Sequence, residues 1–180
     1  MITITELSSA YNTTQIVFDY VTKGHYRAIL CPGEDSFGVE FVYEEFDHEI
    51  EKTFIDILVP SYLDHPKSFA AKINDQIVGY VVVNHELYNN RIRIAQLLVL
   101  NGFRNLGVGK LLMNHAEEYA KKIGARALIL ETQSCNLIAI SFYRGCGYQF
   151  VGCDTMCYSN QDIEKNEVRL ELGKALSQNS

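Results

Sequence analysis

The fold of this chain is decided by one stretch, Arg104-Asn105-Leu106-Gly107-Val108-Gly109-Lys110. It lies between an apolar segment, Arg91 to Leu100, and a segment whose apolar residues recur at helical spacing, so it forms a strand-to-helix turn. Its two glycines allow successive backbone N–H groups to point into one concavity, beside the positive end of the following helix. Such a turn suits a pyrophosphate, and Arg104 and Lys110 can add positive charge.

Two common phosphate-binding motifs do not fit this stretch. A Walker loop needs Lys and then Ser or Thr directly after its second glycine, but Val108-Gly109 follows Gly107. A dinucleotide-binding fingerprint needs a third glycine where this chain has Leu112. Two interpretations stay open at this point: a pyrophosphate loop of another class, and a tight turn that binds no ligand.

The segments on either side of the turn predict a mixed α/β sheet. Asn74-Asp75 joins two apolar runs as a hairpin turn, and Gly124 ends the helix that follows the glycine turn. The predicted strands are Ser68–Ile73, Gln76–Val83, Arg91–Leu100, Ala127–Thr132, Tyr148–Tyr158 and Val168–Leu172, and the second predicted helix is Asn136–Arg144. The run Leu97–Leu100 is apolar throughout, which favours burial on both faces of the sheet. This order of strands and helices is typical of a mixed α/β fold.

The chain before Ser68 gives a weaker pattern. It predicts a strand from Met1, a helix through Thr13 to Thr22 and a strand from Phe37 to Phe46. Residues 177–180 have the composition of a frayed tail, and no repeat or linker interrupts the rest. We therefore expect one domain over residues 1–176, in agreement with a length of 180 residues.

Composition and charge argue against several classes of function. The formal net charge of −6 argues against a nucleic-acid-binding protein, since such proteins are usually basic. No run approaches the roughly 18 apolar residues of a membrane span, and Met1 to Glu6 lacks the basic start and apolar core of a signal peptide. A cytoplasmic protein with no membrane partner is expected. The five cysteines have no CxxC spacing, so reduced thiols and no metal site are expected.

Acidic residues are concentrated between Glu34 and Asp56. This segment holds nine acids and a single base, Lys52. One interpretation is a solvated face of the protein. The other is a surface whose electrostatic field attracts a cationic substrate.

The segment from Arg104 to Gly109, placed after a buried strand, resembles the acetyl-CoA pyrophosphate loop of the GNAT superfamily of N-acetyltransferases. The resemblance implies a GNAT-type α/β fold: a mixed, mostly antiparallel central sheet whose fourth and fifth strands splay apart, flanked by helices on both faces. Leu97-Leu98-Val99 then corresponds to the splayed strand, whose backbone amides hold the pantetheine arm and stabilise the thioester oxyanion. Acetyl-CoA is the implied acetyl donor. The implied cofactor-binding residues are Leu97, Leu98, Val99, Arg104, Asn105, Leu106, Gly107, Val108, Gly109, Lys110, Asn136 and Tyr143.

A second element downstream supports the same family. The segment Phe142-Tyr143-Arg144-Gly145-Cys146-Gly147-Tyr148 is similar to the family's Phe-Tyr-x-x-x-Gly-Phe/Tyr segment, whose tyrosine protonates the departing thiolate. A phenol pKa of about 10 is close to a thiol pKa of about 8.5, so this proton transfer is chemically sensible. Asn136 would share the helix face of Tyr143, seven residues on, and would bind the pantetheine amides. The alternative for Tyr143 is a core tyrosine, because the chain has 11 tyrosines.

The resemblance does not decide which residue deprotonates the acceptor. Many relatives carry a carboxylate on the strand before the pyrophosphate loop, where this chain has Ala95 and Gln96. Glu131 is the candidate catalytic carboxylate, because it lies near the end of the next predicted strand. His85-Glu86, a water relay and an amine that binds already neutral are the alternatives.

Further residues resemble one subgroup, the streptothricin acetyltransferases. They are Leu130-Glu131-Thr132-Gln133, Asn136, Phe142-Tyr143 to Tyr148, Gly152-x-Asp154 and Tyr158. This resemblance implies acetylation of a cationic antibiotic at its β-lysine amine, and hence antibiotic resistance. The acidic segment would suit such a polycation. Gln96 and Leu106 depart from the pattern, since an acid and a basic residue are usual at those places.

The implied enzyme is an N-acetyltransferase that works by direct transfer in a ternary complex. Cys135 has no histidine beside it in the sequence, so an acetyl-cysteine intermediate is not expected. A protein N-terminus, a polyamine and other amines are alternative acceptors. A non-catalytic acyl-CoA-binding module and a purely structural protein are alternatives from other classes. Members of the family often pair through an exposed C-terminal strand, so a homodimer is a further possibility.

Overall fold

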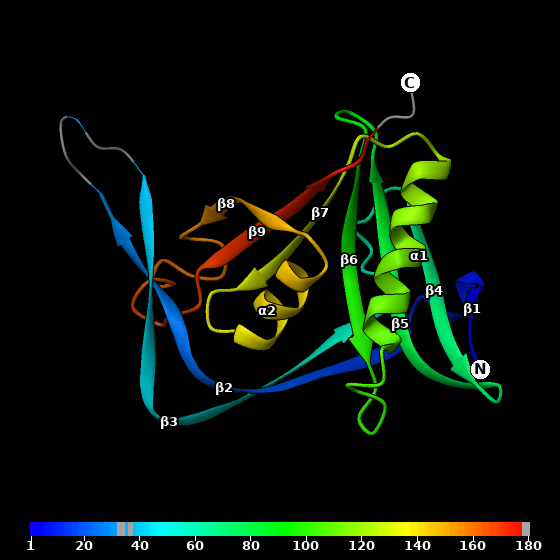
Figure 1. Ribbon diagram of the computed structural model, residues 1–180, viewed down its shortest axis with the longest axis horizontal. Helices are drawn as coiled ribbons and strands as arrows, with labels where there is room; N and C mark the ends of the chain where they lie inside the picture. The colour runs from blue at the N-terminus through cyan, green and yellow to red at the C-terminus, as the bar shows by residue number, and fades with distance from the viewer. Residues whose placement is uncertain (32–34, 36–37, 178–180) are drawn as a thin grey trace. The chain divides into compact units, whose positions relative to one another are not determined.

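The computed structural model describes residues 1–31, 35 and 38–177 (Figure 1). The chain divides into two compact units. The first unit contains residues 1–18, 54–130 and those from 173 onward, and the second contains residues 19–53 and 131–172. Most of the predicted frayed tail, residues 178–180, lies outside the described residues.

The larger sheet has the strand order β1-β4-β5-β6-β7-β9-β8, and β2 pairs with β3 in a separate two-stranded sheet. In sequence order the elements are β1 (Ile2–Glu6), a 3-10 turn (Ser9–Tyr11), β2 (Gln15–Leu30), β3 (Val39–Ile57), β4 (Pro66–Ile73), β5 (Gln76–Glu86), β6 (Arg91–Val99), α1 (Val108–Lys122), β7 (Ala127–Gln133), α2 (Leu137–Gly145), β8 (Gln149–Asp154) and β9 (Arg169–Ala175). The pairs β1–β4, β4–β5 and β5–β6 are antiparallel, whereas β6–β7 is parallel. The predicted mixed, mostly antiparallel sheet is confirmed. The C-terminal strand β9 is not an edge strand, because it lies between β7 and β8.

The two helices and six strands predicted after Ser68 are confirmed. At most of their ends, the observed boundary differs from the predicted boundary by a few residues. The largest difference is in the strand predicted to reach Tyr158, which ends at Asp154.

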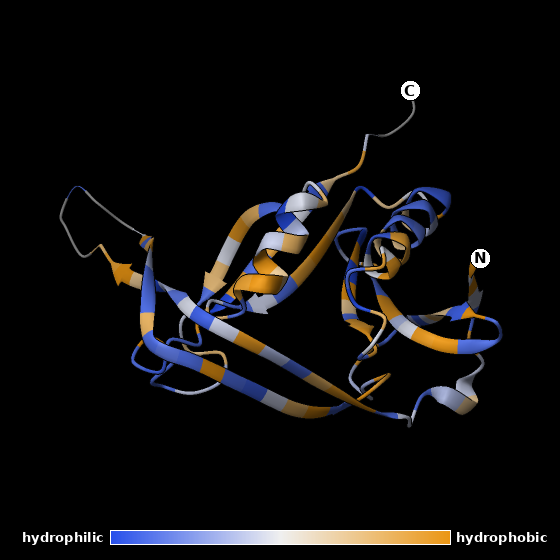
Figure 2. Ribbon diagram, turned by 60° about the horizontal axis from the view of Figure 1, so that its bottom comes forward, coloured by the Kyte–Doolittle hydropathy of each residue, from blue (hydrophilic) through white to orange (hydrophobic). Residues whose placement is uncertain are grey.

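The helix predicted through Thr13 to Thr22 is wrong. Most of these residues begin β2, and Figure 2 shows hydrophobic and hydrophilic segments alternating along the β2–β3 ribbon. Ile16, Tyr20 and Thr22 are buried, whereas Val17 is exposed, and this period of two is that of a strand. A spacing of four, as between Ile16 and Tyr20, fits a helix and a strand alike, which explains the wrong prediction.

The strand predicted from Phe37 to Phe46 is present in β3, which begins at Val39 and runs on to Ile57. Phe37 itself lies outside the described residues. The two strands of the ribbon approach closely at Gly24. A Cβ atom at Gly24 would lie 2.3 Å from the carbonyl oxygen of Glu44, so the ribbon needs glycine there.

In the first unit, α1 lies along β4, β5 and β6 (Figure 1). Phe69 of β4 contacts His115 and Tyr119 of the helix, with ring centroids 4.5 and 5.7 Å apart. The opposite face of the strands carries a core cluster of Ile16, Leu58, Ala70, Tyr80, Val82 and Leu98. Ile16, near the start of β2, and Leu58, just after the end of β3, therefore help to cover this face. No α-helix covers it in the described part of the unit, so helices on both faces are not found here.

The helix α1 ends at the predicted glycine. Gly124 has a φ of 72°, and its N–H donates to the carbonyl of Lys121 at 3.1 Å. Ala125 N–H donates to the carbonyl of Ala120 at 2.9 Å. These two bonds form a Schellman cap, which satisfies carbonyl groups that the helix end would otherwise leave unpaired.

The strands β6 and β7 pair over only part of their length. Their register runs from Arg91–Ala127 to Ile94–Leu130, whereas β6 continues to Val99. The register with β5 passes from Ile94 to Gln96, so Ala95 forms a bulge at the same place. This pair corresponds to the splayed strands that the resemblance implied. Burial alternates along β6, so the expected burial of its apolar end on both faces is wrong.

In the second unit, α2 packs against strands through a small core cluster. Ile140 of the helix, Ala28 of β2, and Val168 and Leu170 at and beside the start of β9 form it. The side chain of Asn136 caps the N-terminus of α2, because its Oδ1 accepts a hydrogen bond from Ala139 N–H at 3.1 Å.

Candidate functional site

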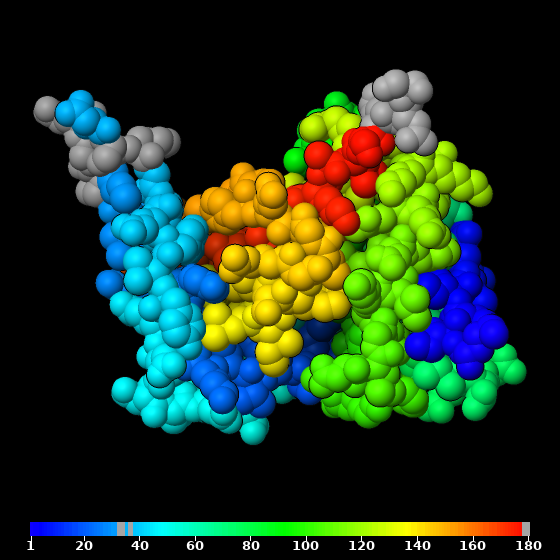
Figure 3. Space-filling model, viewed as in Figure 1, coloured from blue at the N-terminus to red at the C-terminus, as the bar shows by residue number. Residues whose placement is uncertain are grey.

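The loop after β6 presents backbone groups to solvent. Gly102, Asn105 and Gly107 have φ angles of 85°, 63° and 81°, a left-handed conformation that glycine and asparagine tolerate best. Gly107 is the N-cap of α1, and glycine has no side chain with which to cap that end of the helix. The loop is exposed on the surface, where Figure 3 shows it in green. The N–H groups of the first turn and the positive dipole end of α1 lie at this exposed loop, as an anion-binding site requires.

Two cations belong to this loop. Arg104 and Lys110 are both exposed. Arg104 Nε also donates to the carbonyl oxygen of Val99 at 3.3 Å, which ties the loop to the end of β6. The geometry fits the predicted pyrophosphate loop, because exposed N–H groups and two cations occur in one short segment.

Gly79 on β5 sets how closely α1 approaches the end of β6. A Cβ atom at Gly79 would lie 2.8 Å from the carbonyl oxygen of Leu98, 3.2 Å from Leu112 Cδ1 and 3.3 Å from Val108 Cγ1. Any larger residue would push the start of the helix away from the strand. The sequence analysis did not single out Gly79, although a glycine inside a strand is the signal for such a close approach.

The predicted backbone contacts on β6 lie beyond the point where it parts from β7. Leu97, Leu98 and Val99 pair with Val81, Tyr80 and Gly79 on the β5 side. On the other side, the register with β7 has ended at Ile94. The first unit therefore brings together the predicted strand residues 97–99 and the predicted loop residues 104–110.

Tyr143 lies on α2 in the second unit, and its side chain is buried, with 9% exposure. Its ring packs on Phe142 and Tyr148, with centroid distances of 5.4 and 6.3 Å. Burial raises the pKa of Tyr143 well above its ordinary value of about 10, so the phenol keeps its proton at neutral pH. A protonated phenol can act as a general acid. The same burial would be found for a core tyrosine.

Asn136 does not lie on the helical face predicted for it. As the N-cap of α2 it has non-helical angles (φ −84°, ψ 70°), and its carbonyl oxygen is used by the cap. Its amide NH₂ group is the part that can still bind a ligand.

Glu131 lies near the end of β7, where its carboxylate is paired. Arg169 Nη2 is 2.6 Å from Glu131 Oε2 and 2.8 Å from Glu171 Oε1. Burial, and then the nearby charge of Glu131, raise the pKa of Tyr158 above its ordinary value. The second unit therefore gathers Glu131, Arg169 and Tyr158 into one polar group.

The thiol of Cys135 is poorly suited to nucleophilic attack. It is 1% exposed, and the hydroxyl of Tyr20 lies 3.5 Å from its sulfur. Burial raises the pKa of Cys135 above its ordinary value, so the thiolate is scarce at neutral pH. The environment of Cys135 favours direct transfer over an acetyl-cysteine intermediate.

The alternative base Glu86 is the last residue of β5 and lies far along the sheet from the glycine loop. It pairs with Arg91, at the opposite end of β6 from the glycine loop. Burial alone would raise the pKa of Glu86, but hydrogen bonds from Arg93 and Arg91 outweigh it and lower that pKa. The neighbouring alternative, His85, is held by Asn90 at 3.0 Å. Both residues have structural partners at the β5–β6 hairpin.

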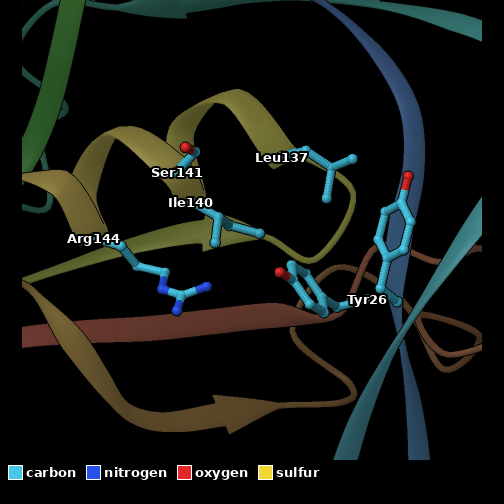
Figure 4. A pocket seen from close by; sticks show the side chains of 6 residues that line it. Tyr26, Leu137, Ile140, Ser141 and Arg144 are labelled. Carbon is cyan, nitrogen blue, oxygen red and sulfur yellow. The ribbon is translucent and has the colours of Figure 1, made fainter.

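A pocket of about 490 Å³ lies in the second unit, beside α2. It is lined by Tyr26, Tyr43, Leu137, Ile140, Ser141 and Arg144. Figure 4 shows the α2 side chains that line it. The guanidinium of Arg144 would repel a polycation, so we do not assign this pocket to a cationic acceptor. This pocket could not be predicted from the sequence, because its walls come from separate segments.

Neither a metal centre nor a membrane span is found in the described chain. No three or more His, Cys, Asp or Glu residues are grouped so as to hold a metal ion in the part of the chain that the structure describes. None of the helices in that part is long and apolar enough to cross a membrane.

Comparison with known proteins gives a consistent result. The model of the Acetyltransferase (GNAT) family matches residues 33–148. A streptothricin acetyltransferase from Streptomyces lavendulae is 35% identical over 95 residues, which are 53% of this chain and 50% of that relative. The match thus spans about half the length of that relative.

Solved structures resemble nearly the whole chain. The crystal structure of nourseothricin acetyltransferase has a TM-score of 0.80 and 25% identity, and the match covers 98% of this chain and 99% of that one. A candidate streptothricin acetyltransferase from Bacillus anthracis, solved in complex with acetyl coenzyme A, has a TM-score of 0.73 and 24% identity over 98% of each chain. The second likeness, at 24% identity, shows the fold alone.

Proposed function

We propose that this chain, which belongs to the Acetyltransferase (GNAT) family, transfers the acetyl group of acetyl-CoA directly to an amine. The proposed acceptor is a primary amine of a small cationic molecule. The observation that carries the proposal is the exposed glycine loop at the start of α1, where Gly107 is the N-cap. This loop lies within the residues that the family model matches. Streptothricin, at its β-lysine amine, is the leading acceptor, because streptothricin acetyltransferases are among the relatives.

The donor is proposed to bind along β6 and the glycine loop. The pyrophosphate would lie on the N–H groups at the start of α1, with Arg104 and Lys110 adding charge. The backbone amides of Leu97, Leu98 and Val99 would hold the pantetheine arm and stabilise the oxyanion. Loop residues 105–109 would shape the turn, and the family resemblance assigns the pantetheine amides to the side chain of Asn136, whose NH₂ group is a donor.

Tyr143 is proposed as the general acid. The amine attacks the thioester carbonyl carbon, the carbon–sulfur bond breaks, and the phenol gives its proton to the departing thiolate. Burial keeps this phenol protonated. Exclusion of water also makes a thiolate more basic, which helps the proton to move.

The acceptor is proposed to be cationic because of the charges that the second unit displays. Glu45, Asp47, Glu49 and Glu51 recur at every second position of β3 and are all exposed. Such a line of carboxylates raises the local concentration of a polycation. Glu131 is the carboxylate proposed from the sequence as catalytic. It would also attract the ammonium group of the acceptor, although it forms an ion pair with Arg169.

The proposal is tested by mass-spectrometric detection of acetylated product. The protein would be incubated with acetyl-CoA and streptothricin, and in parallel with polyamines, aminoglycosides and peptides with free N-termini. Mass detection is preferable to a thiol dye, because the five cysteines of the chain would give a background signal. Product with streptothricin supports the full proposal. Product with only another amine replaces the acceptor, and bound acetyl-CoA without any product would indicate a binding module.

A further inference from the structure

The acceptor amine must lose a proton before or during its attack, and the chain lacks the usual carboxylate on β6. Position 96, where many relatives have an acid, is Gln96, and the bulge residue beside it is Ala95. Gln96 is nevertheless buried, with 7% exposure, which is unusual for an amide side chain without a specific partner.

The partner of Gln96 is a carboxylate from another strand. Gln96 Nε2 donates to Asp56 Oδ2 at 2.7 Å, and it lies 3.4 Å from the carbonyl oxygen of Ile57. The other oxygen, Asp56 Oδ1, accepts from Ile57 N–H at 2.7 Å. Asp56 is only partly buried, and each carboxylate oxygen has a second lone pair available. The carboxylate is therefore held in place and still open to a ligand.

This carboxylate lies on the sheet face opposite α1. Gln96 pairs across the strands with Val82, which belongs to the core cluster on that face. Leu58, two residues after Asp56, belongs to the same cluster. All these residues are in the first unit, and Gln96 lies on β6, which continues into Leu97, Leu98 and Val99.

We infer that Asp56 is the general base of the acetyl transfer and that Gln96 is its positioning residue. This inference rests on the proposed function. The chain keeps one carboxylate beside the bulge of β6 but supplies it from the end of β3, while position 96 supplies an amide donor. An acid at position 96 would place two like charges together, so glutamine is the residue that fits beside Asp56.

The carboxylate of Asp56 takes one proton from the acceptor ammonium and releases it to solvent. The neutral nitrogen forms a bond to the thioester carbonyl carbon, and the carbon–sulfur bond breaks. Tyr143 protonates the thiolate, and the surplus proton on nitrogen returns through solvent to the tyrosinate. The products are an amide, free CoA and one proton.

The first test is the pH profile of turnover in Asp56→Asn, with the amine that the wild-type protein acetylates. The variant should turn over about 10- to 1,000-fold more slowly at neutral pH. Its rate should then rise about tenfold per pH unit toward the amine pKa, near 10.4 for a lysine-like amine, because only neutral amine can react. The wild-type profile should be flatter. The acetyl-CoA dissociation constant should stay within about twofold of wild type, which also shows that the variant is folded.

The second test moves the carboxylate back to β6. In the double variant Asp56→Asn/Gln96→Glu the hydrogen bond is kept with donor and acceptor exchanged. It should regain turnover and the flatter pH profile relative to Asp56→Asn. The matched control is Asp75→Asn, an exposed aspartate in the β4–β5 turn, which should behave like wild type.

Each outcome decides between the candidates. A uniform loss of rate at every pH in Asp56→Asn, with no rescue in the double variant, would assign a structural role and overturn the inference. A steeper pH profile in Glu131→Gln instead of Asp56→Asn would make Glu131 the base and overturn it as well. Wild-type protein that acetylates no amine would overturn the proposed function, and the inference with it.

Discussion

At the residue scale, the proposed acid and base lie in opposite environments. Tyr143 is buried among aromatic rings, and burial keeps its proton in place. Asp56 is partly exposed and is oriented by hydrogen bonds from Gln96 and Ile57. The family resemblance pointed to Tyr143 from the sequence, because its motif is local. No local pattern could point to Asp56, whose partner Gln96 lies 40 residues away in the sequence and is brought near only by the fold.

The prediction for Tyr143 is a loss of turnover without a loss of donor binding. Tyr143→Phe removes one hydroxyl from a packed ring, so turnover should fall by about 10- to 1,000-fold while the acetyl-CoA dissociation constant changes little. Steady-state kinetics and calorimetric titration would measure the two quantities. Tyr119→Phe, in a partly buried tyrosine of α1, is the matched control and should retain turnover. Normal turnover in Tyr143→Phe would leave Tyr143 as a core residue.

At the element scale, the glycine loop and α1 are the elements that the sequence predicted best. The signals are local: two glycines, a helical apolar pattern and a capping glycine at Gly124. The ribbon of β2 and β3 was predicted poorly, because apolar residues four apart fit both a helix and a strand. The close approach at Gly79 depends on where α1 packs, and a strand glycine alone does not reveal its partner.

The prediction for the glycine loop and α1 concerns Gly107. Gly107→Val places a branched side chain at a φ of 81°, next to the N–H groups proposed to hold the pyrophosphate. The acetyl-CoA dissociation constant should rise about tenfold or more, since roughly 1.4 kcal/mol of binding free energy corresponds to tenfold. Calorimetric titration would measure it.

The matched control for Gly107→Val is at the other end of the same helix. Gly124→Val imposes similar backbone strain at a φ of 72°, but away from the loop. It should lower the thermal midpoint of unfolding and leave the dissociation constant unchanged. Equal weakening of acetyl-CoA binding in both variants would mean that loss of helix stability, rather than the loop, explains the effect.

At the scale of the whole molecule, charge is distributed unevenly. The net charge is −6, and exposed carboxylates follow one another along β3. The sequence revealed the acidic segment but not its arrangement, because only the strand assignment places alternate residues on one side. Glu86, also acidic, has a different role, since two arginines hold it at the β5–β6 hairpin.

The acidic ribbon predicts a salt-dependent substrate preference. Asp47 and Glu51 are exposed and have no ion-pair partner among the residues that the structure describes. Asp47→Asn/Glu51→Gln should lower kcat/KM for a polycationic acceptor about two- to tenfold at low salt, because steering toward the ribbon is weakened. The difference should vanish near 1 M salt, where charges are screened beyond about 3 Å. An equal kcat/KM at low salt would make the ribbon a solvated face only.

The cluster that Glu86 forms with Arg91 and Arg93 predicts that the stability of the fold depends on pH. The pKa of Glu86 is lower in the folded protein than in the unfolded chain, where it is about 4.3. The cluster therefore stabilises the fold at pH values above the unfolded pKa, and this contribution is lost as the pH falls through the folded pKa. Glu86→Gln should therefore cost about 1–3 kcal/mol in the free energy of unfolding at pH 7 and much less in strong acid. Urea unfolding at both pH values would measure this. Turnover should be retained, and its loss would return Glu86 to the list of candidate bases.

The most direct test of acetyl transfer is a mass spectrum of streptothricin after incubation with the protein and isotope-labelled acetyl-CoA. The account predicts a product that carries one labelled acetyl group on the β-lysine amine and that forms only when the protein is present. Absence of labelled product from streptothricin and from every other amine, with acetyl-CoA still bound, would contradict it.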